Sequence, residues 1–126
     1  MIVVDASAAL SALFNDGTAR RVVATVNVQV PHLIDSEIAS GVRSRVRSGQ
    51  LAPDVGWRLI ETWSRLGVNR HPIVGVLDRI WELRDNLSAY DAGYVALAEA
   101  LGCDLLTADR RLAGASGVRC PITVVP

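Results

Sequence analysis

Apolar residues follow two alternating patterns along the chain. Short runs rich in apolar residues, at 2–4, 28–30, 105–107 and 122–125, predict strands, and the run at 2–4 is fully apolar. A further extended piece is expected at 68–71. Runs of this kind are typical of parallel strands that are buried on both faces. Between them, apolar positions recur at helical spacing. The helices expected from that spacing are 7–14, 18–27, one that begins at Ile34 or Asp35 and stops before Gly49, 54–66, 73–84 and 90–101, with one helical turn at 110–113.

The stretch 88–109 carries the strongest signal. Its tyrosines and leucines, Tyr90 among them, form one face of a helix and its alanines form another, so the helix is apolar nearly all round. A helix of that kind is buried in the protein. Gly102 ends it, as glycine commonly does, and a short buried strand follows. Two carboxylates bracket this unit, with Asp91 in the first turn of the helix and Asp109 just past the strand.

Strands that alternate with helices predict an α/β domain with a central, mostly parallel sheet flanked by helices. The length of 126 residues is typical of one domain, so residues 1–126 are expected to form a single unit. Within the helix at 73–84, we expect Leu77, Ile80 and Trp81 to face the core.

Composition restricts the chemistry. All thirteen basic residues are arginine, so mechanisms that need a lysine are excluded. The net charge is zero, and no large basic field indicates nucleic acid binding. That balance changes if some of the acids hold divalent cations, because each ion adds two positive charges.

The apolar runs, the N-terminus and the cysteines indicate where the protein is located and whether its thiols are reduced. No apolar run is long enough to span a membrane, and the N-terminus lacks the basic region of a signal peptide. We therefore expect a cytoplasmic protein. Cys103 and Cys120 form no C-x-x-C motif, which favours two buried, reduced thiols over a disulfide or a zinc site.

Four acids fall at positions that meet at one edge of such a sheet. Asp5 ends the first strand and Asp109 follows the strand at 105–107, while Glu37 and Asp91 stand in the first turns of helices. Right-handed crossovers place these positions on the same side, where open α/β sheets bind ligands. Each acid also has an ordinary interpretation as a helix cap or turn residue, Asp91 through the capping pattern that begins at Ser88.

Four convergent carboxylates repel one another, and a divalent cation relieves that repulsion. Carboxylate oxygens suit Mg²⁺ or Mn²⁺ rather than zinc. We expect the dipoles of the helices to keep Glu37 and Asp91 ionised. Ser7 and Thr107 lie beside Asp5 and Asp109 in sequence and could orient a water or ligand, although helix capping is an equal alternative for Ser7. His32 and His71 are isolated and are not expected to be ligands.

Four segments together resemble the PIN-domain ribonucleases, and most closely the short VapC-type toxins of bacterial toxin–antitoxin pairs. They are Val-Val-Asp5-Ala-Ser7-Ala, Asp35-Ser-Glu37-Ile, Ser88-Ala-Tyr90-Asp91-Ala-Gly-Tyr-Val-Ala-Leu-Ala and Leu-Leu-Thr107-Ala-Asp109-Arg-Arg-Leu. The resemblance covers nearly the whole chain, and its third segment is the most specific.

The resemblance implies a PIN-like fold and a metal-dependent endoribonuclease. By the resemblance, Asp5, Glu37, Asp91 and Asp109 match the metal-binding and catalytic acids of the family, with Mg²⁺ or Mn²⁺ as cofactor. It also implies a homodimer and inhibition by a small VapB-type antitoxin. The motifs do not encode which RNA is cut.

Five arginines follow these acids in sequence and could contact RNA phosphates in a bidentate manner. They are Arg43, Arg45, Arg47, Arg110 and Arg111. We predict that at least one of the first three contacts phosphate; a solvated helix face is the alternative. Few aromatic residues are available as platforms for stacked bases.

Two other classes of protein fit the sequence less well than the nuclease. A haloacid-dehalogenase-like phosphatase would need a second Asp where Ser7 stands, and a lysine, and a phospho-receiver domain lacks the same lysine. The remaining alternative is a non-catalytic α/β protein-binding module whose acids only cap helices.

Overall fold

Five short strands form one sheet in the computed structural model, which describes residues 1–126. The strands are β1 (Ile2–Val4), β2 (Val28–Pro31), β3 (Asn69–His71), β4 (Asp104–Thr107) and β5 (Ile122–Val124). The helices are α1 (Ala6–Phe14), α2 (Thr18–Thr25), α3 (Ile34–Arg47), α4 (Pro53–Arg65), the 3₁₀ turn η1 (Val74–Val76), α5 (Leu77–Glu82), α6 (Ala89–Leu101) and α7 (Arg110–Ala113).

The sheet has the order β3-β2-β1-β4-β5, and every neighbouring pair is parallel. Ile2 of β1 stands between Val28 of β2 and Asp104 of β4. The chain first builds outward from β1 to β2 and β3, then returns to the other side of β1 to add β4 and β5. The order therefore reverses between β1 and β4, and the carboxyl ends of these two strands mark the usual ligand site of an open α/β sheet.

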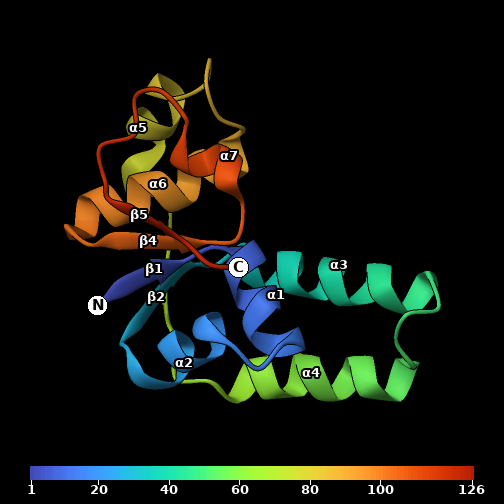
Figure 1. Ribbon diagram of the computed structural model, residues 1–126. Helices are drawn as coiled ribbons and strands as arrows, with labels where there is room; N and C mark the ends of the chain where they lie inside the picture. The colour runs from blue at the N-terminus through green and yellow to red at the C-terminus, as the bar shows by residue number, and fades with distance from the viewer.

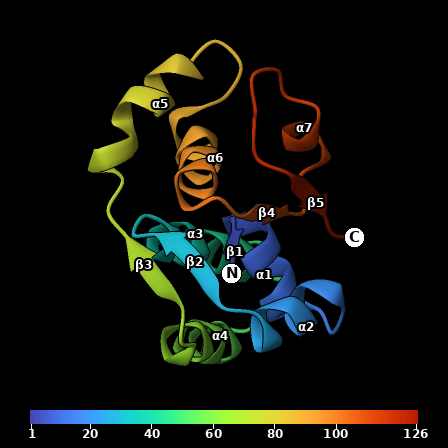
Figure 2. The same cartoon turned by 90° about the vertical axis from the view of Figure 1, so that its left-hand side faces the viewer.

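Helices cover both faces of the sheet (Figures 1 and 2). The helices α1 to α4 lie on one side, where α3 and α4 form a long antiparallel pair that extends beyond the sheet (Figure 1). On the other side α6 lies against β1, β2 and β4, with α5 packed on its outer flank and α7 beside β5. Each helix is too short or too polar to span a lipid bilayer.

The core lies between the central strands and these two helix layers. Val3, Val30 and Leu105 are fully buried in the sheet, and Ile34 and Val95 meet them from α3 and α6. This burial explains why β1 reads as a continuous apolar run, since both of its faces are covered. Parallel strands flanked by helices confirm the predicted fold class.

Local signals set the ends of the main helices. Asp5 caps α1 by accepting a hydrogen bond from the amide of Ala8 at 2.9 Å, and Ser88 caps α6. Gly102 ends α6 with a φ of 66°, a left-handed conformation that suits glycine. The helix predicted at 18–27 is shorter, because the backbone is already extended at Val26.

The single helix predicted at 73–84 is wrong. The segment splits into η1 and the short α5, and its first turn contains Gly75 between two valines, which are poor helix formers. Ile80 is buried as expected, whereas Leu77 and Trp81 are 51% and 68% exposed. The guanidinium of Arg84 covers the Trp81 ring at 4.6 Å instead.

Three further expectations concern single side chains. Tyr90, placed on the apolar face of α6, is 62% exposed, whereas Tyr94 one turn later is buried. Cys103 and Cys120 are free thiols, the first buried and the second half-buried. Burial raises the pKa of the Cys120 thiol to about 11. His71, which was not expected to be a metal ligand, forms a hydrogen bond with the side chain of Gln29 at 2.6 Å.

Candidate functional site

The four acids lie at the carboxyl edge of the sheet, as the topology predicted. Asp5 directly follows β1, and Asp109 caps α7 after β4, the neighbouring strand. Glu37 is in the first turn of α3, which follows β2, and Asp91 is in the first turn of α6. The reversal of strand order between β1 and β4 therefore brings together residues that are far apart in sequence.

Asp5 is the most deeply held of the four, with only 4% of its surface exposed. Its carboxylate accepts hydrogen bonds from the Ser7 hydroxyl at 2.7 Å, the Thr107 hydroxyl at 2.5 Å and the Ala8 amide at 2.9 Å. Burial raises the pKa of Asp5, and these three donors oppose that shift because they favour the charged form. The carboxylate is thus fixed in position at the junction of β1, α1 and β4.

Ser7 and Thr107 connect Asp5 to the turn that carries Asp109. The Ser7 hydroxyl accepts from the Ala108 amide at 2.9 Å, and the Thr107 hydroxyl accepts from the Asp109 amide at 3.0 Å. Each hydroxyl has a single proton, which it donates to Asp5. The capping alternative for Ser7 is wrong, because Asp5 itself is the N-cap of α1.

Glu37 is held by a residue that the sequence did not single out. The hydroxyl of Tyr94, on α6, donates to the Glu37 carboxylate at 2.8 Å. Burial, and after it the charges of Asp91 and Asp5, raise the pKa of Glu37, while the Tyr94 bond lowers it. Tyr94 belongs to an apolar helix face. The sequence indicated only that its hydroxyl, if buried, would need a hydrogen-bond partner, and not which residue that partner is.

Asp91 is not the helix cap of α6. Its amide donates to the Ser88 hydroxyl at 3.2 Å, so Ser88 performs that role. The Asp91 carboxylate accepts no hydrogen bond from the Ser88 amide, and the capping box is therefore incomplete. Burial raises the pKa of Asp91, and the neighbouring charge of Asp109 raises it further.

Asp109 differs from the other three acids because it has a cationic partner. Arg111 donates to both of its carboxylate oxygens, at 3.2 and 3.0 Å, and these bonds lower the pKa of Asp109. Asp109 and Asp91 line one cavity of about 310 Å³, and Arg111 and Ser88 complete part of its wall.

Repulsion links the four acids into one group. Asp5 and Glu37 are each destabilised as anions by Asp91, and Asp91 by Asp109. The expectation that helix dipoles hold Glu37 and Asp91 ionised is therefore incomplete, since burial and like charge act in the opposite direction. Oxygen donors that repel one another fit a hard divalent cation.

The side chains nevertheless do not form a closed metal cage in this conformation. No three His, Cys, Asp or Glu side chains stand close enough to hold an ion together. Both oxygens of Asp109 are occupied by Arg111. Oδ1 of Asp109 accepts two bonds from Arg111, whereas Oδ2 accepts one, so a cation would share the Asp109 carboxylate with Arg111 or displace it.

The five arginines do not share one environment. Arg43, Arg47 and Arg110 are exposed, and Arg111 is bound to Asp109. The guanidinium of Arg45 lies over the ring of Phe14, with 3.8 Å to the ring centroid.

Comparison with known proteins identifies the family of the chain. The PIN domain model matches residues 2–118. Ribonuclease VapC9 of Mycobacterium tuberculosis is 60% identical over 126 residues, which cover all of this chain and 99% of VapC9. Ribonuclease VapC1 of the same species is 37% identical over 128 residues, covering 98% of this chain and 96% of the relative.

Solved structures agree on the fold. The crystal structure of PAE2754 from Pyrobaculum aerophilum superimposes with a TM-score of 0.73 at 25% identity, covering 96% of this chain and 81% of the other. VapC20 of Mycobacterium tuberculosis, described as a toxin that cleaves the sarcin-ricin loop, gives a TM-score of 0.67 at 18% identity, with coverage of 94% and 97%. The sequence match over the full length and the shared fold show that this chain belongs to the VapC-type PIN-domain ribonucleases, the toxins of toxin–antitoxin systems.

Proposed function

We propose that this ribonuclease cuts RNA internally by Mg²⁺- or Mn²⁺-dependent hydrolysis at the carboxyl edge of β1 and β4. The proposed metal ligands are four carboxylates: Asp5, Glu37, Asp91 and Asp109. A bound divalent cation would supply Lewis-acid stabilisation and a water of lowered pKa. One observation carries the proposal: acids from four separate elements gather where the strand order reverses, and three of them have pKa values raised by burial and repulsion.

The surrounding residues have separate tasks in this proposal. Ser7 and Thr107 fix the Asp5 carboxylate, so that one ligand is oriented before any ion binds. Tyr94 does the same for Glu37. Orientation of this kind reduces the reorganisation needed at the site. Arg111 balances the charge of Asp109 in the free protein and is placed beside the cavity where a phosphate would enter.

The alternative of acids that only cap helices fits half of the group. Asp5 and Asp109 do cap α1 and α7. Glu37 accepts its hydrogen bond from a tyrosine on another helix, and Asp91 leaves the capping to Ser88. Capping therefore accounts for the backbone at two acids and for neither of the other two.

Partners are proposed on the basis of family membership and exposed surface. We assign to this toxin a cognate VapB-type antitoxin and a homodimeric state. Trp57 on α4 and Trp81 on α5 are 60% and 68% exposed, and each carries apolar surface that a partner would cover. A titration of the purified protein by light scattering, alone and with its antitoxin, tests both assignments.

A cleavage assay tests the central proposal. Purified protein, freed of antitoxin, should cut total cellular RNA with Mg²⁺ or Mn²⁺, and excess EDTA should stop the reaction. Sequencing of the new 5′ ends would identify the RNA and the position of the cut. Cleavage that persists after full chelation would rule out the metal mechanism.

A further inference from the structure

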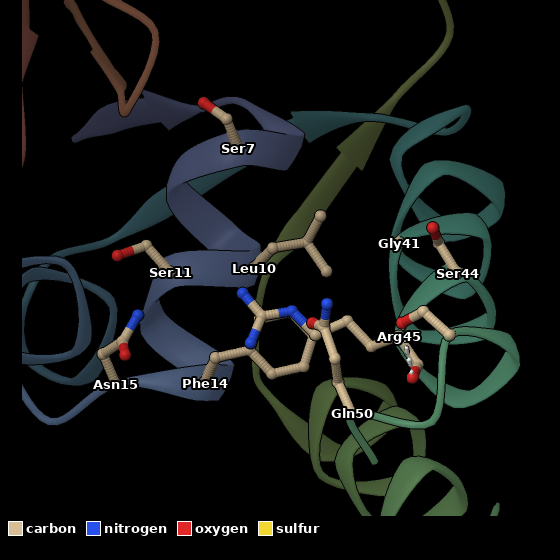
Figure 3. Close-up of a pocket in the computed structure, with 10 residues that line it drawn as sticks. Ser7, Leu10, Ser11, Phe14, Asn15, Gly41, Ser44, Arg45 and Gln50 are labelled. Atoms are coloured by element: carbon tan, nitrogen blue, oxygen red, sulfur yellow. Dashed lines mark hydrogen bonds between the residues drawn. The ribbon is translucent and has the colours of Figure 1, made fainter.

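A polar groove of about 500 Å³ lies between α1 and α3 (Figure 3). Ser7 stands at one end of it, where its hydroxyl is bonded to Asp5, and Arg45 and Gln50 lie toward the other end. From Ser7 to Phe14 the groove follows α1 for roughly 10 Å, at about 1.5 Å per residue. The groove therefore begins beside Asp5, at the acidic edge, and leads away from it.

The wall of the groove has a different charge from the acidic edge. Arg45 is its only charged residue, and no acid lines it. Hydroxyl and amide groups supply most of the remaining surface: Ser7, Ser11, Asn15, Ser44, Ser48 and Gln50. One cation among neutral hydrogen-bonding groups suits a phosphodiester strand better than a metal ion or an apolar peptide.

Arg45 is positioned before any ligand binds. Its guanidinium stacks on the Phe14 ring at 3.8 Å, and it makes no ion pair with an acid of this chain. The other exposed arginines of α3, Arg43 and Arg47, have no aromatic partner. Stacking restricts a flexible side chain in advance, so less freedom is lost when the guanidinium binds a phosphate.

The packing of the two helices explains why Arg45 and Phe14 meet. One turn earlier, Leu10 of α1 packs against Gly41 of α3, where an added Cβ would come within 2.5 Å of the Leu10 side chain. Leu10 and Phe14 are four residues apart, as are Gly41 and Arg45, so the second contact lies directly above the first. The small residue lets the helices approach and sets Arg45 opposite Phe14.

We propose that the groove between α1 and α3 holds the RNA strand that flanks the cleaved bond, with Arg45, oriented by Phe14, on one of its phosphates. The proposal rests on the ribonuclease function and adds to it the path of the substrate on one side of the acids. Phe14 acts in it as a positioning residue, because it reaches the phosphate only through Arg45.

The test is RNA binding measured by fluorescence anisotropy with a labelled oligouridylate, in EDTA and over a range of salt concentrations. Arg45→Ala should weaken binding and reduce the slope of log K against log salt by about 0.7, the value for one lost phosphate contact on a single strand. Arg21→Ala is the matched control: Arg21 is an exposed arginine on α2 whose side chain bonds only to Thr18 and lies outside the groove. Its slope should equal that of the wild type.

Two further variants separate orientation from charge. Phe14→Leu and Arg45→Lys both keep the positive charge and lose the flat stack, so each should lower the affinity several-fold with little change in slope. In the presence of Arg45→Ala, the change Phe14→Leu should have no further effect on affinity. That loss of additivity would not follow from a purely structural role of Phe14.

The outcomes distinguish this proposal from the nuclease itself. The proposal that the groove binds RNA is overturned by equal slopes for Arg45→Ala and Arg21→Ala. It is also overturned if the wild-type protein binds no oligouridylate. Additive effects of the Phe14 and Arg45 changes overturn the positioning role of Phe14. If the protein binds RNA through Arg45 but fails the cleavage assay, the proposed cleavage mechanism is overturned. The proposal that the groove binds RNA then still stands.

Discussion

Arg111 holds Asp109 by three hydrogen bonds, two from its guanidinium at 3.2 and 3.0 Å and one from its own amide at 3.0 Å. The side chain of Arg111 is 91% exposed, so this pair forms at the rim of the site and is screened by water. Asp109 is consequently the one acid of the group whose negative charge is already compensated. The positive charge of Arg111 therefore opposes the binding of a cation at Asp109.

Removing this positive charge should strengthen metal binding. We expect Arg111→Gln to bind Mn²⁺ several-fold more tightly than the wild type, because Asp109 is freed and a positive charge near Asp91 is lost. Isothermal titration calorimetry measures the affinity directly. Arg110→Gln removes an equal charge from an arginine that bonds to no acid, and its effect should be smaller. Equal affinities for Arg111→Gln and the wild type would show that the pair does not restrain Asp109.

The hydroxyl of Thr107 should matter more than its methyl group. Thr107→Val keeps the shape of a fully buried residue but removes one donor to Asp5 and the acceptor for the Asp109 amide. Leaving such groups unpaired costs about 1–3 kcal/mol, and the free energy of unfolding in urea should fall by that amount. Thr107→Ser keeps the hydroxyl and loses one methyl group, at a cost of roughly 0.8 kcal/mol. A Val variant more stable than the Ser variant would contradict this order.

Asp91 should behave as a ligand rather than a cap. In EDTA, we expect Asp91→Asn to be as stable as the wild type or more stable, because the variant relieves repulsion with Asp109 and keeps the Ser88 cap. Added Mg²⁺ or Mn²⁺ should raise the melting temperature of the wild type more than that of the variant, since a ligand stabilises only the state that binds it. RNA cleavage should be lost. If Asp91 were a cap residue, its replacement by Ala would instead lower the stability of the protein by about 0.5–2 kcal/mol, and Asn would be tolerated.

Asp35 should contribute stability that depends on pH. Its carboxylate accepts from Arg70 at 2.8 and 3.0 Å and from the Trp63 indole at 2.8 Å, which ties α3 to β3 and α4. The Arg70 bonds lower the pKa of Asp35 from its usual 3.8, so the stabilisation is present above that value and lost as the pH falls through the folded-state pKa. Asp35→Asn should therefore destabilise the protein at pH 7, on the order of 1 kcal/mol for a pair that is half exposed.

A urea series from neutral pH downward measures this effect. The difference in unfolding free energy between the wild type and Asp35→Asn should shrink toward zero in acid. Asp54→Asn provides the control, because Asp54 is 76% exposed and pairs only with Arg58 on the same helix. A difference for Asp35→Asn that is constant with pH would mean that the charge of Asp35 does not contribute.

Much of the fold follows from patterns within a few residues. The apolar run at Ile2–Val4 and the buried pattern of α6 were both predicted, because burial on two faces or all round leaves its mark directly in the sequence. The ends of α6 were set by Ser88 and Gly102, whose effects on the backbone are local. The prediction of one helix at 73–84 failed because this segment buries only Ile80 and Leu83 fully. Val74, Leu77 and Trp81 stay exposed.

The acidic positions were also accessible from sequence, since the carboxyl ends of parallel strands share one edge whatever their order. The contacts that organise the site were not. The pairing of Thr107 with Asp5 spans 102 positions and that of Tyr94 with Glu37 spans 57. These partners depend on β4 lying beside β1 and on α6 crossing the sheet. A hydrophobic pattern determines which residues are buried but not the order of strands, and only that order decided which hydroxyl meets each acid and that Arg45 meets Phe14.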